Sequence, residues 1–124
     1  MTITICAMGE LLAEFLSRNP HQKFTQPGEF IGPFPSGAPA IFAAQVAKLS
    51  HRAIFFGCVG NDDFARLIIE RLRHEGVITD GIHVMNNAVT GTAFVSYQNP
   101  QLRDFVFNIP TSACGLFTAE HIDK

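Results

Sequence analysis

The sequence lacks the charge excess and the long apolar runs that nucleic-acid-binding and membrane-spanning proteins carry. Its 124 residues include 9 basic and 11 acidic side chains, for a net charge of −2, so electrostatics gives no reason to expect nucleic acid or an anionic membrane as a partner. No apolar run is long enough to span a bilayer, and no basic segment precedes an apolar stretch as in a secretory signal. We therefore expect a cytoplasmic location.

The sequence also has few residues in metal-binding or nucleotide-binding patterns. Its three cysteines, Cys6, Cys58 and Cys114, are odd in number and far apart, so we expect small buried apolar residues rather than a disulfide framework or a zinc site. The five histidines form no H-x-x-x-H or H-x-x-E-H pair, so no metal site is expected. The lysine-bearing phosphate loop and the G-x-G-x-x-G of dinucleotide-binding proteins are absent from the chain.

Apolar runs separated by glycine turns predict alternating strands and helices. Strands are expected at residues 2–8, 53–59 and 82–85, because each is a short apolar or β-prone run. Helices are expected at residues 38–49 and 62–75. This order predicts an α/β fold with parallel strands and right-handed crossovers.

Both predicted helices have recognisable ends and an apolar face. Ser36 is expected to cap the first helix, and Pro39 suits its first turn. Asp62 and Asp63 favour the positive end of the second helix, and Gly76 supplies its stop. The buried faces should consist of large apolar side chains: Ile41, Phe42, Val46 and Leu49 in the first helix, and Phe64, Leu67, Ile68 and Leu72 in the second.

Three further segments are β-prone and lie outside this alternation. Residues 27–35 are rich in proline, glycine and phenylalanine, which favours an irregular or edge strand. Residues 90–97 and 104–109, joined by the turn-rich linker 98–103, should form an antiparallel hairpin separate from the main sheet. Their aromatic faces need a cover, which a ligand, the domain below or another subunit would provide. Near the end of the chain, Thr118 is expected to cap the start of a helix.

Four residues near these turns are candidates for ligand contacts, and each has a structural alternative. Glu14 follows the first strand, where a carboxylate can accept hydrogen bonds from sugar hydroxyls, or it is simply solvated. Gly37 heads the first helix, where a ligand can approach the backbone, or it serves only the turn. Tyr97 either points its hydroxyl into a site or packs on the hairpin. Arg103 either pairs with a ligand anion or lies in solvent.

Five short motifs occur in the order found in one enzyme family. They are Gly9-Glu-Leu-Leu-Ala-Glu14, Ser36-Gly-Ala-Pro-Ala40, Gly57-x-Val-Gly-Asn-Asp-Asp-Phe64, Thr90-Gly-Thr-Ala93 and Ser112-Ala113. Over essentially its whole length the chain resembles the N-terminal portion of the ribokinase-like carbohydrate kinases, the phosphofructokinase-B family. The motifs are most similar to those of keto-sugar and sugar-acid kinases such as fructokinase, tagatose kinase and 2-keto-3-deoxygluconate kinase.

The resemblance implies a fold, a reaction and a set of site residues. The fold is the N-terminal part of a doubly wound α/β domain with a small β lid, here at about residues 15–35 and 89–110. The reaction transfers the γ-phosphate of ATP to a sugar hydroxyl with a magnesium ion. By resemblance, Glu14, Gly37 and Ala38 bind the sugar or sugar acid, and Tyr97 and Arg103 contribute from the lid. Lids of such kinases often form dimers, which implies a homodimer.

Four positions depart from the family pattern, so the resemblance does not identify which sugar is bound. Ser36 replaces the first glycine of the usual pair, and Ile41 stands where many members carry a sugar-contacting asparagine. Glu14 is one methylene longer than the usual aspartate, and Ala65 stands where a glycine is common.

The family's catalytic Gly-Ala-Gly-Asp motif and its ATP-binding loops have no counterpart in residues 113–124. We therefore expect residues 1–124 to be the sugar-binding portion, with the nucleotide-binding portion and every catalytic residue absent. Such a chain, as a truncated gene product, a product of a split reading frame or an excised piece, should bind neither ATP nor magnesium well and should have no kinase activity. An open sheet edge should make it associate or leave it marginally stable. The alternative is a non-catalytic sugar-binding or oligomerisation module.

Overall fold

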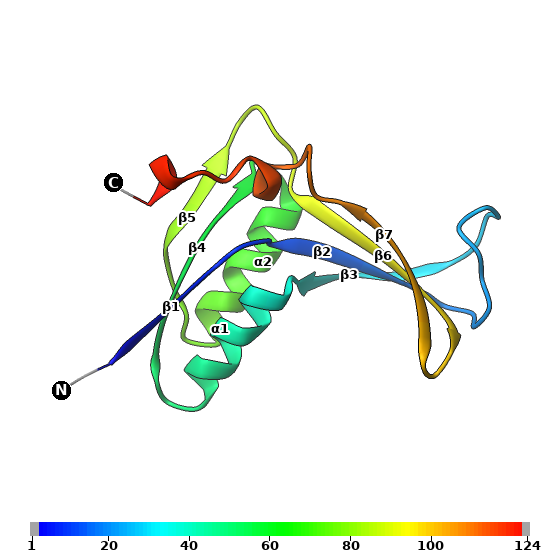
Figure 1. The fold of residues 1–124 in the computed structure, drawn as a ribbon, viewed down its shortest axis with the longest axis horizontal. Helices are drawn as coiled ribbons and strands as arrows, with labels where there is room; N and C mark the ends of the chain where they lie inside the picture. The colour runs from blue at the N-terminus through cyan, green and yellow to red at the C-terminus, as the bar shows by residue number, and fades with distance from the viewer. Residues whose placement is uncertain (1–2, 123–124) are drawn as a thin grey trace.

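Three parallel strands and two helices form the core of the protein in a computed structural model that describes residues 3–122. The strands pair in the order β1-β4-β5, and the helices connect them as the alternation predicted (Figure 1). The bounds of these elements are β1 Thr4–Met8, α1 Ala38–Lys48, β4 Arg52–Gly60, α2 Asp63–His74 and β5 Ile78–Met85. The predicted α/β class is therefore confirmed, although β5 begins four residues before the expected strand. Residue 2 of the first expected strand lies outside the described residues.

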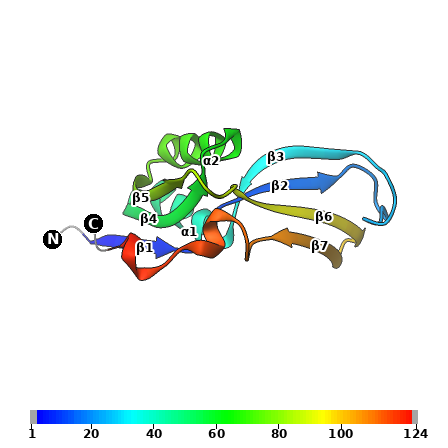
Figure 2. The same cartoon turned by 90° about the horizontal axis from the view of Figure 1, so that it is seen from above.

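A second sheet of four strands projects to one side of this core (Figure 2). Its strand order is β3-β2-β6-β7, with β2 and β6 parallel and the two outer pairs antiparallel. The bounds are β2 Leu12–Ser17, β3 Phe30–Ser36, β6 Gly91–Asn99 and β7 Leu102–Asn108. The predicted edge strand and the separate hairpin are confirmed. The hairpin loop is shorter than predicted, because both strands extend into the expected linker and leave two residues between them.

The core is packed around small side chains of α1. Both helices lie on one face of the three-stranded sheet, and their buried side chains share one cluster with Leu11, Phe55 and Val59. In α1 the buried residues are Ala40, Ala43, Ala44 and Val46. Of the predicted face of α1 only Val46 is buried; the prediction was wrong for Ile41, Phe42 and Leu49, which are each more than half exposed. Alanines occupy the inner face because they let the helix backbone approach the sheet closely, which larger side chains would prevent.

The ends of α2 follow the sequence closely. Asp62 is the N-cap, and its Oδ1 accepts a hydrogen bond from the Ala65 backbone N–H at 3.0 Å. The helix ends before Gly76, whose φ of 92° lies in the region that favours glycine. The predicted apolar face is confirmed for its centre, where Ile68 and Leu72 are buried. Neither α1 nor α2, within the described residues, is long and apolar enough to cross a membrane.

The C-terminal segment covers part of the other face of the core sheet. It contains two short 3-10 helices, η1 (Ala113–Leu116) and η2 (Ala119–His121), and Thr118 caps η2 as predicted.

Cys58 and Cys114 are buried, and burial together with the nearby Cys114 raises the pKa of the Cys58 thiol. Cys6 is exposed on β1, so its predicted burial was wrong. Among the described strands none pairs with the outer edge of β1.

Candidate functional site

Glu14 and Ser36 form a polar pair where β2 and β3 meet the core. Glu14 lies opposite Phe34 in the antiparallel register, and Ser36 lies opposite Leu12. Both polar side chains therefore stand on the same face of the sheet. The Ser36 hydroxyl donates a hydrogen bond to Glu14 Oε2 at 2.5 Å. The prediction that Ser36 caps α1 was wrong, because its hydroxyl is engaged with Glu14 instead.

The start of α1 lies directly beside this pair. Gly37 is the N-cap residue with a φ of 110°, and a Cβ at this position would collide with the Glu10 carbonyl oxygen. No side chain caps this helix, and Pro39 in its first turn has no N–H. The backbone N–H groups at this end therefore favour oxygen atoms of a ligand, and the exposed Ala38 leaves them accessible.

The turn between β1 and β2 closes the same corner from the other side. Gly9 has a φ of 144°, and a Cβ there would lie 2.6 Å from Pro39 Cγ. The β1–β2 turn thus packs against the first turn of α1. The structure brings together Glu14, Gly37 and Ala38, three of the five predicted site residues. We call these three residues with Ser36 the Glu14 corner.

Tyr97 and Arg103 form a second, separate group. They lie opposite each other in β6 and β7, and the Arg103 guanidinium carbon is 5.8 Å from the Tyr97 ring centroid. Arg103 is inside β7 and not in the loop where the sequence placed it. Glu14 pairs with Ala93 of β6, and Tyr97 follows Ala93 by four residues. Because side chains alternate between the two faces of a sheet, Tyr97 and its partner Arg103 lie on the face that carries Glu14. At about 3.3 Å per residue they lie roughly 13 Å farther along the sheet than Glu14.

A groove of about 260 Å³ between α1 and α2 also begins at Ser36. Its far end is formed by Lys48, Arg71 and Glu75, where the Glu75 carboxylate pairs with Lys48 at 3.1 Å and with Arg71 at 2.6 Å. Burial raises the pKa of the Glu75 carboxyl, but the hydrogen bonds and charges of Arg71 and Lys48 outweigh it and hold the pKa below its ordinary value. The charges of Glu75 and its two partners thus compensate one another, and we interpret the groove as part of the packing interface between α1 and α2.

Known proteins similar to this chain are sugar kinases. Fructokinase-1 of Zea mays is 32% identical over 119 residues, which are 96% of this chain and 36% of that enzyme. An Escherichia coli protein described as ribokinase II superposes with a TM-score of 0.94 at 45% identity, over 99% of this chain and 39% of that one. The same protein has been solved in complex with ATP and Mg²⁺. Fructokinase of Vibrio cholerae, solved with fructose, ADP and a calcium ion, superposes with a TM-score of 0.79 at 28% identity, over 98% of this chain and 37% of that one.

The chain therefore spans a little more than a third of the length of these relatives. Within residues 3–122 no three His, Cys, Asp or Glu side chains are grouped as metal ligands. The phosphate-binding motifs sought in the sequence are also missing.

The model of the family described as pfkB family carbohydrate kinase matches residues 5–123. This range includes the Glu14 corner, both helices and, apart from Thr4, both sheets. The solved structures support the same family, because they share the ribokinase-like α/β arrangement at 45% and 28% sequence identity. The chain belongs to the pfkB family of carbohydrate kinases.

Proposed function

We propose that residues 1–124 form the sugar-binding portion of an ATP-dependent carbohydrate kinase that acts on a keto-sugar or a sugar acid. The observation that supports this most is the Glu14 corner. It holds a carboxylate fixed by one hydroxyl beside a helix start that no side chain caps. Acceptor oxygens next to free backbone donors suit a ligand with many hydroxyl groups. The fructose complex of the Vibrio cholerae relative favours a ketose.

Each corner residue has a role in this proposal. Glu14 accepts hydrogen bonds from sugar hydroxyls, and Ser36 holds its side chain in place. Gly37 and Ala38 let the sugar approach the start of α1. Ile41, exposed one turn farther along the helix, offers an apolar contact in place of an amide.

The four-stranded sheet would act as a lid, made of residues 15–35 and 89–110. In the present arrangement Tyr97 and Arg103 are too far from Glu14 to share one monosaccharide with it. They reach the sugar only if the sheet bends or closes over the corner, a motion common among enzymes that exclude water. Arg103 would then pair with the carboxylate of a sugar acid.

Phosphoryl transfer depends on positioning and on stabilising charge at the transferred phosphate. The described residues include no group of metal-ligating side chains and the sequence has no phosphate-binding motif, so we assign none of them to that step. The chain alone is expected to bind sugar and to leave ATP unchanged.

The face of the hairpin that carries Tyr97 and Arg103 also favours self-association through the lid. All seven residues of β7 are exposed, and the rings of Phe105 and Phe107 stack 5.1 Å apart. Replacing both phenylalanines by serine should shift the chain toward the monomer in sedimentation velocity at micromolar concentration. An unchanged sedimentation profile would mean that association, if present, uses another surface.

Two assays with the purified chain test the proposed function. Calorimetric titration with fructose, tagatose and 2-keto-3-deoxygluconate should show millimolar or tighter binding of at least one, with an aldopentose such as ribose as the comparison. A coupled assay for ADP release with ATP, Mg²⁺ and the bound sugar should show no turnover. Sugar-dependent ADP release would overturn the predicted inactivity, and a folded chain that binds none of the sugars would overturn the proposed site.

A further inference from the structure

The turn between β4 and α2 is tied to the point where the chain enters the four-stranded sheet. That point is Thr90, which is buried and directly precedes β6. The Asp62 carboxylate accepts hydrogen bonds from the Thr90 backbone N–H at 2.9 Å and from the Thr90 hydroxyl at 2.7 Å. The same hydroxyl accepts a hydrogen bond from the Gly60 backbone N–H at 3.0 Å. One carboxylate and one hydroxyl therefore join the end of β4 to the start of β6.

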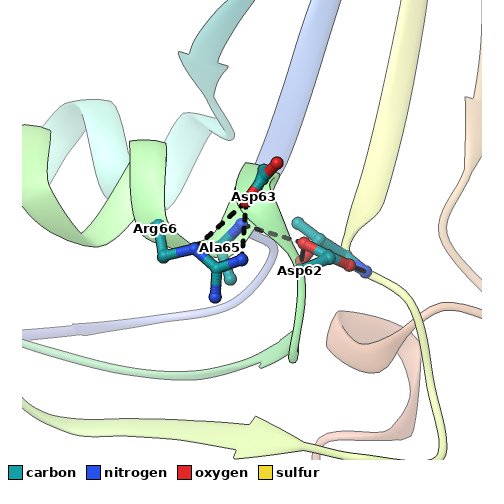
Figure 3. A network of polar contacts seen from close by, with 5 residues as sticks. Asp62, Asp63, Ala65 and Arg66 are labelled. Carbon is teal, nitrogen blue, oxygen red and sulfur yellow. Dashed lines mark hydrogen bonds and ion pairs between the residues drawn. The ribbon is translucent and has the colours of Figure 1, made fainter.

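Asp62 also belongs to the core, because it caps α2 through Ala65 (Figure 3). Its two oxygens thus receive three hydrogen bonds, two from the entrance of the four-stranded sheet and one from the helix. The turn has no room for another side chain: a Cβ on Gly60 would lie 2.6 Å from the Ala88 carbonyl oxygen and 2.7 Å from Asp62 Oδ2. The glycine and the acceptor-only carboxylate are both required by this geometry.

The neighbouring Asp63 has no such role. Its carboxylate bonds to Arg66 in the same helix at 2.5 Å, as Figure 3 shows, and its side chain is exposed to solvent. The two adjacent aspartates therefore carry the same charge at the same helix end, yet only Asp62 contacts the segment leading into β6. Asp63 is a matched control for Asp62.

Among residues 3–122, other contacts also link the core to the four-stranded sheet and to the segment that precedes β6. Phe15 of β2 packs edge-on against Phe64 of α2, with ring centroids 5.7 Å apart, which is an apolar contact that tolerates sliding. The Ala113 N–H donates to the Val89 carbonyl at 2.8 Å, so the C-terminal segment reaches the same connector. The Asp62–Thr90 contact differs from these because its acceptor is charged, because Thr90 is buried, and because it reaches both the backbone and the side chain of Thr90.

We propose that Asp62 is a positioning residue that couples the four-stranded sheet to the core. The two sheets unfold together only while the Asp62 carboxylate is hydrogen-bonded to Thr90. The low pKa of Asp62 is consistent with this role. Burial raises that pKa, but the hydrogen bonds from Thr90 and Ala65 outweigh burial and keep the carboxylate ionised. The proposal concerns how the sheets move together and does not require a bound sugar.

The substitution Asp62→Asn separates coupling from capping. Asparagine caps a helix about as well as aspartate, so the bond from Ala65 can be kept. When its oxygen accepts hydrogen bonds from the Ala65 N–H and the Thr90 hydroxyl, its NH₂ group faces the Thr90 N–H and cannot accept a hydrogen bond from it. A buried donor then lacks its partner, which should favour opening of the four-stranded sheet by about 5- to 100-fold.

The chain offers a separate optical signal for each sheet. Tyr97 is its single tyrosine and there is no tryptophan, so tyrosine fluorescence reports on β6, whereas far-ultraviolet circular dichroism reports mainly on α1 and α2. In urea, the two signals of the wild type should change together. In Asp62→Asn the tyrosine transition should come at lower urea than the dichroism transition, while in Asp63→Asn the two should still coincide. Transitions that separate in the wild type, or that shift together in Asp62→Asn, would overturn the coupling role.

A second variant and one measurement on the wild type keep the test open if Asp62→Asn fails to fold. Thr90→Val removes the hydroxyl but keeps the backbone bond to Asp62, so a smaller separation in the same direction is expected. In wild-type hydrogen exchange, the Thr90 amide should exchange as slowly as the Val95 amide within β6, because both open together. Exchange of the Thr90 amide at the rate of the exposed connector residues would contradict the proposal.

Discussion

The two sheets of this protein bury their side chains to very different extents. The three-stranded sheet packs both helices against one face, and eleven buried residues join in a single cluster. The four-stranded sheet shares a cluster of only three buried residues, and every residue of its outer strand β7 is exposed. The first region thus has the core of an independent fold, whereas the second is an extension that depends on the core for its position. Stability should reside in the first and ligand-dependent motion in the second.

The largest expected effect comes from removing a ring at the centre of the core. Phe55 is fully buried, so Phe55→Ala should lower the free energy of unfolding by about 3–5 kcal/mol and leave the chain largely unfolded. Phe105→Ala, made on the half-exposed ring in β7, should cost less than about 1 kcal/mol. Urea denaturation followed by circular dichroism measures both. Equal losses would mean that the two sheets contribute alike to stability.

A smaller effect is expected at the junction of the two regions. Gly37→Ala should destabilise the chain by about 1–3 kcal/mol, because its φ is positive and the new Cβ would meet the Glu10 carbonyl. Gly76→Ala provides the matched control: its φ is also positive, but its Cβ would meet only Ala47 Cβ at 3.8 Å. Thermal denaturation should place Gly37→Ala below Gly76→Ala. The reverse order would mean that the Glu14 corner is less tightly packed than the contacts indicate.

The smallest effect is expected at the ion pairs of Glu75 in the groove between α1 and α2. The pKa of Glu75 is held below its ordinary value of 4.5 in the folded state, so its stabilising contribution is complete above that value and is lost as the pH falls through the folded-state pKa. Glu75→Gln should therefore flatten the loss of stability below pH 4.5, by less than about 1 kcal/mol because its partners are half exposed. Glu70→Gln, at an exposed position of α2, should leave the pH profile unchanged in urea titrations.

The core could be predicted from the sequence because its signals are local. The acidic residues Asp62 and Asp63 at its start and the stop at Gly76 bound α2, and short apolar runs mark β1 and β4. The inner face of α1 could not be predicted in the same way. Hydrophobic periodicity selects the large residues Ile41 and Leu49, but the distance between helix and sheet decides which residues fit, and here only alanines and one valine do.

The four-stranded sheet was harder to predict because its pairing is long-range. The strand β2 contains Glu14 among apolar residues and pairs with β6, about eighty positions away, so no local pattern marks it. Without β2, the contact of Ser36 with Glu14 could not be foreseen, and Ser36 looked like a helix cap. The hairpin loop was also overestimated: Asn99 accepts hydrogen bonds from the N–H groups of Gln101 and Leu102, which tightens the turn to two residues.

The most direct test of the sugar-binding proposal is a fructose titration of three proteins by calorimetry. The wild type should bind, Glu14→Gln should bind at least about tenfold more weakly because it loses a charged acceptor, and Glu29→Gln should bind like the wild type. Glu29 is an exposed carboxylate paired with Arg18 and makes no contact with the Glu14 corner. Circular dichroism confirms that each protein is folded. Equal fructose affinities for the wild type and Glu14→Gln would contradict the account, since the sugar would then bind without the Glu14 corner.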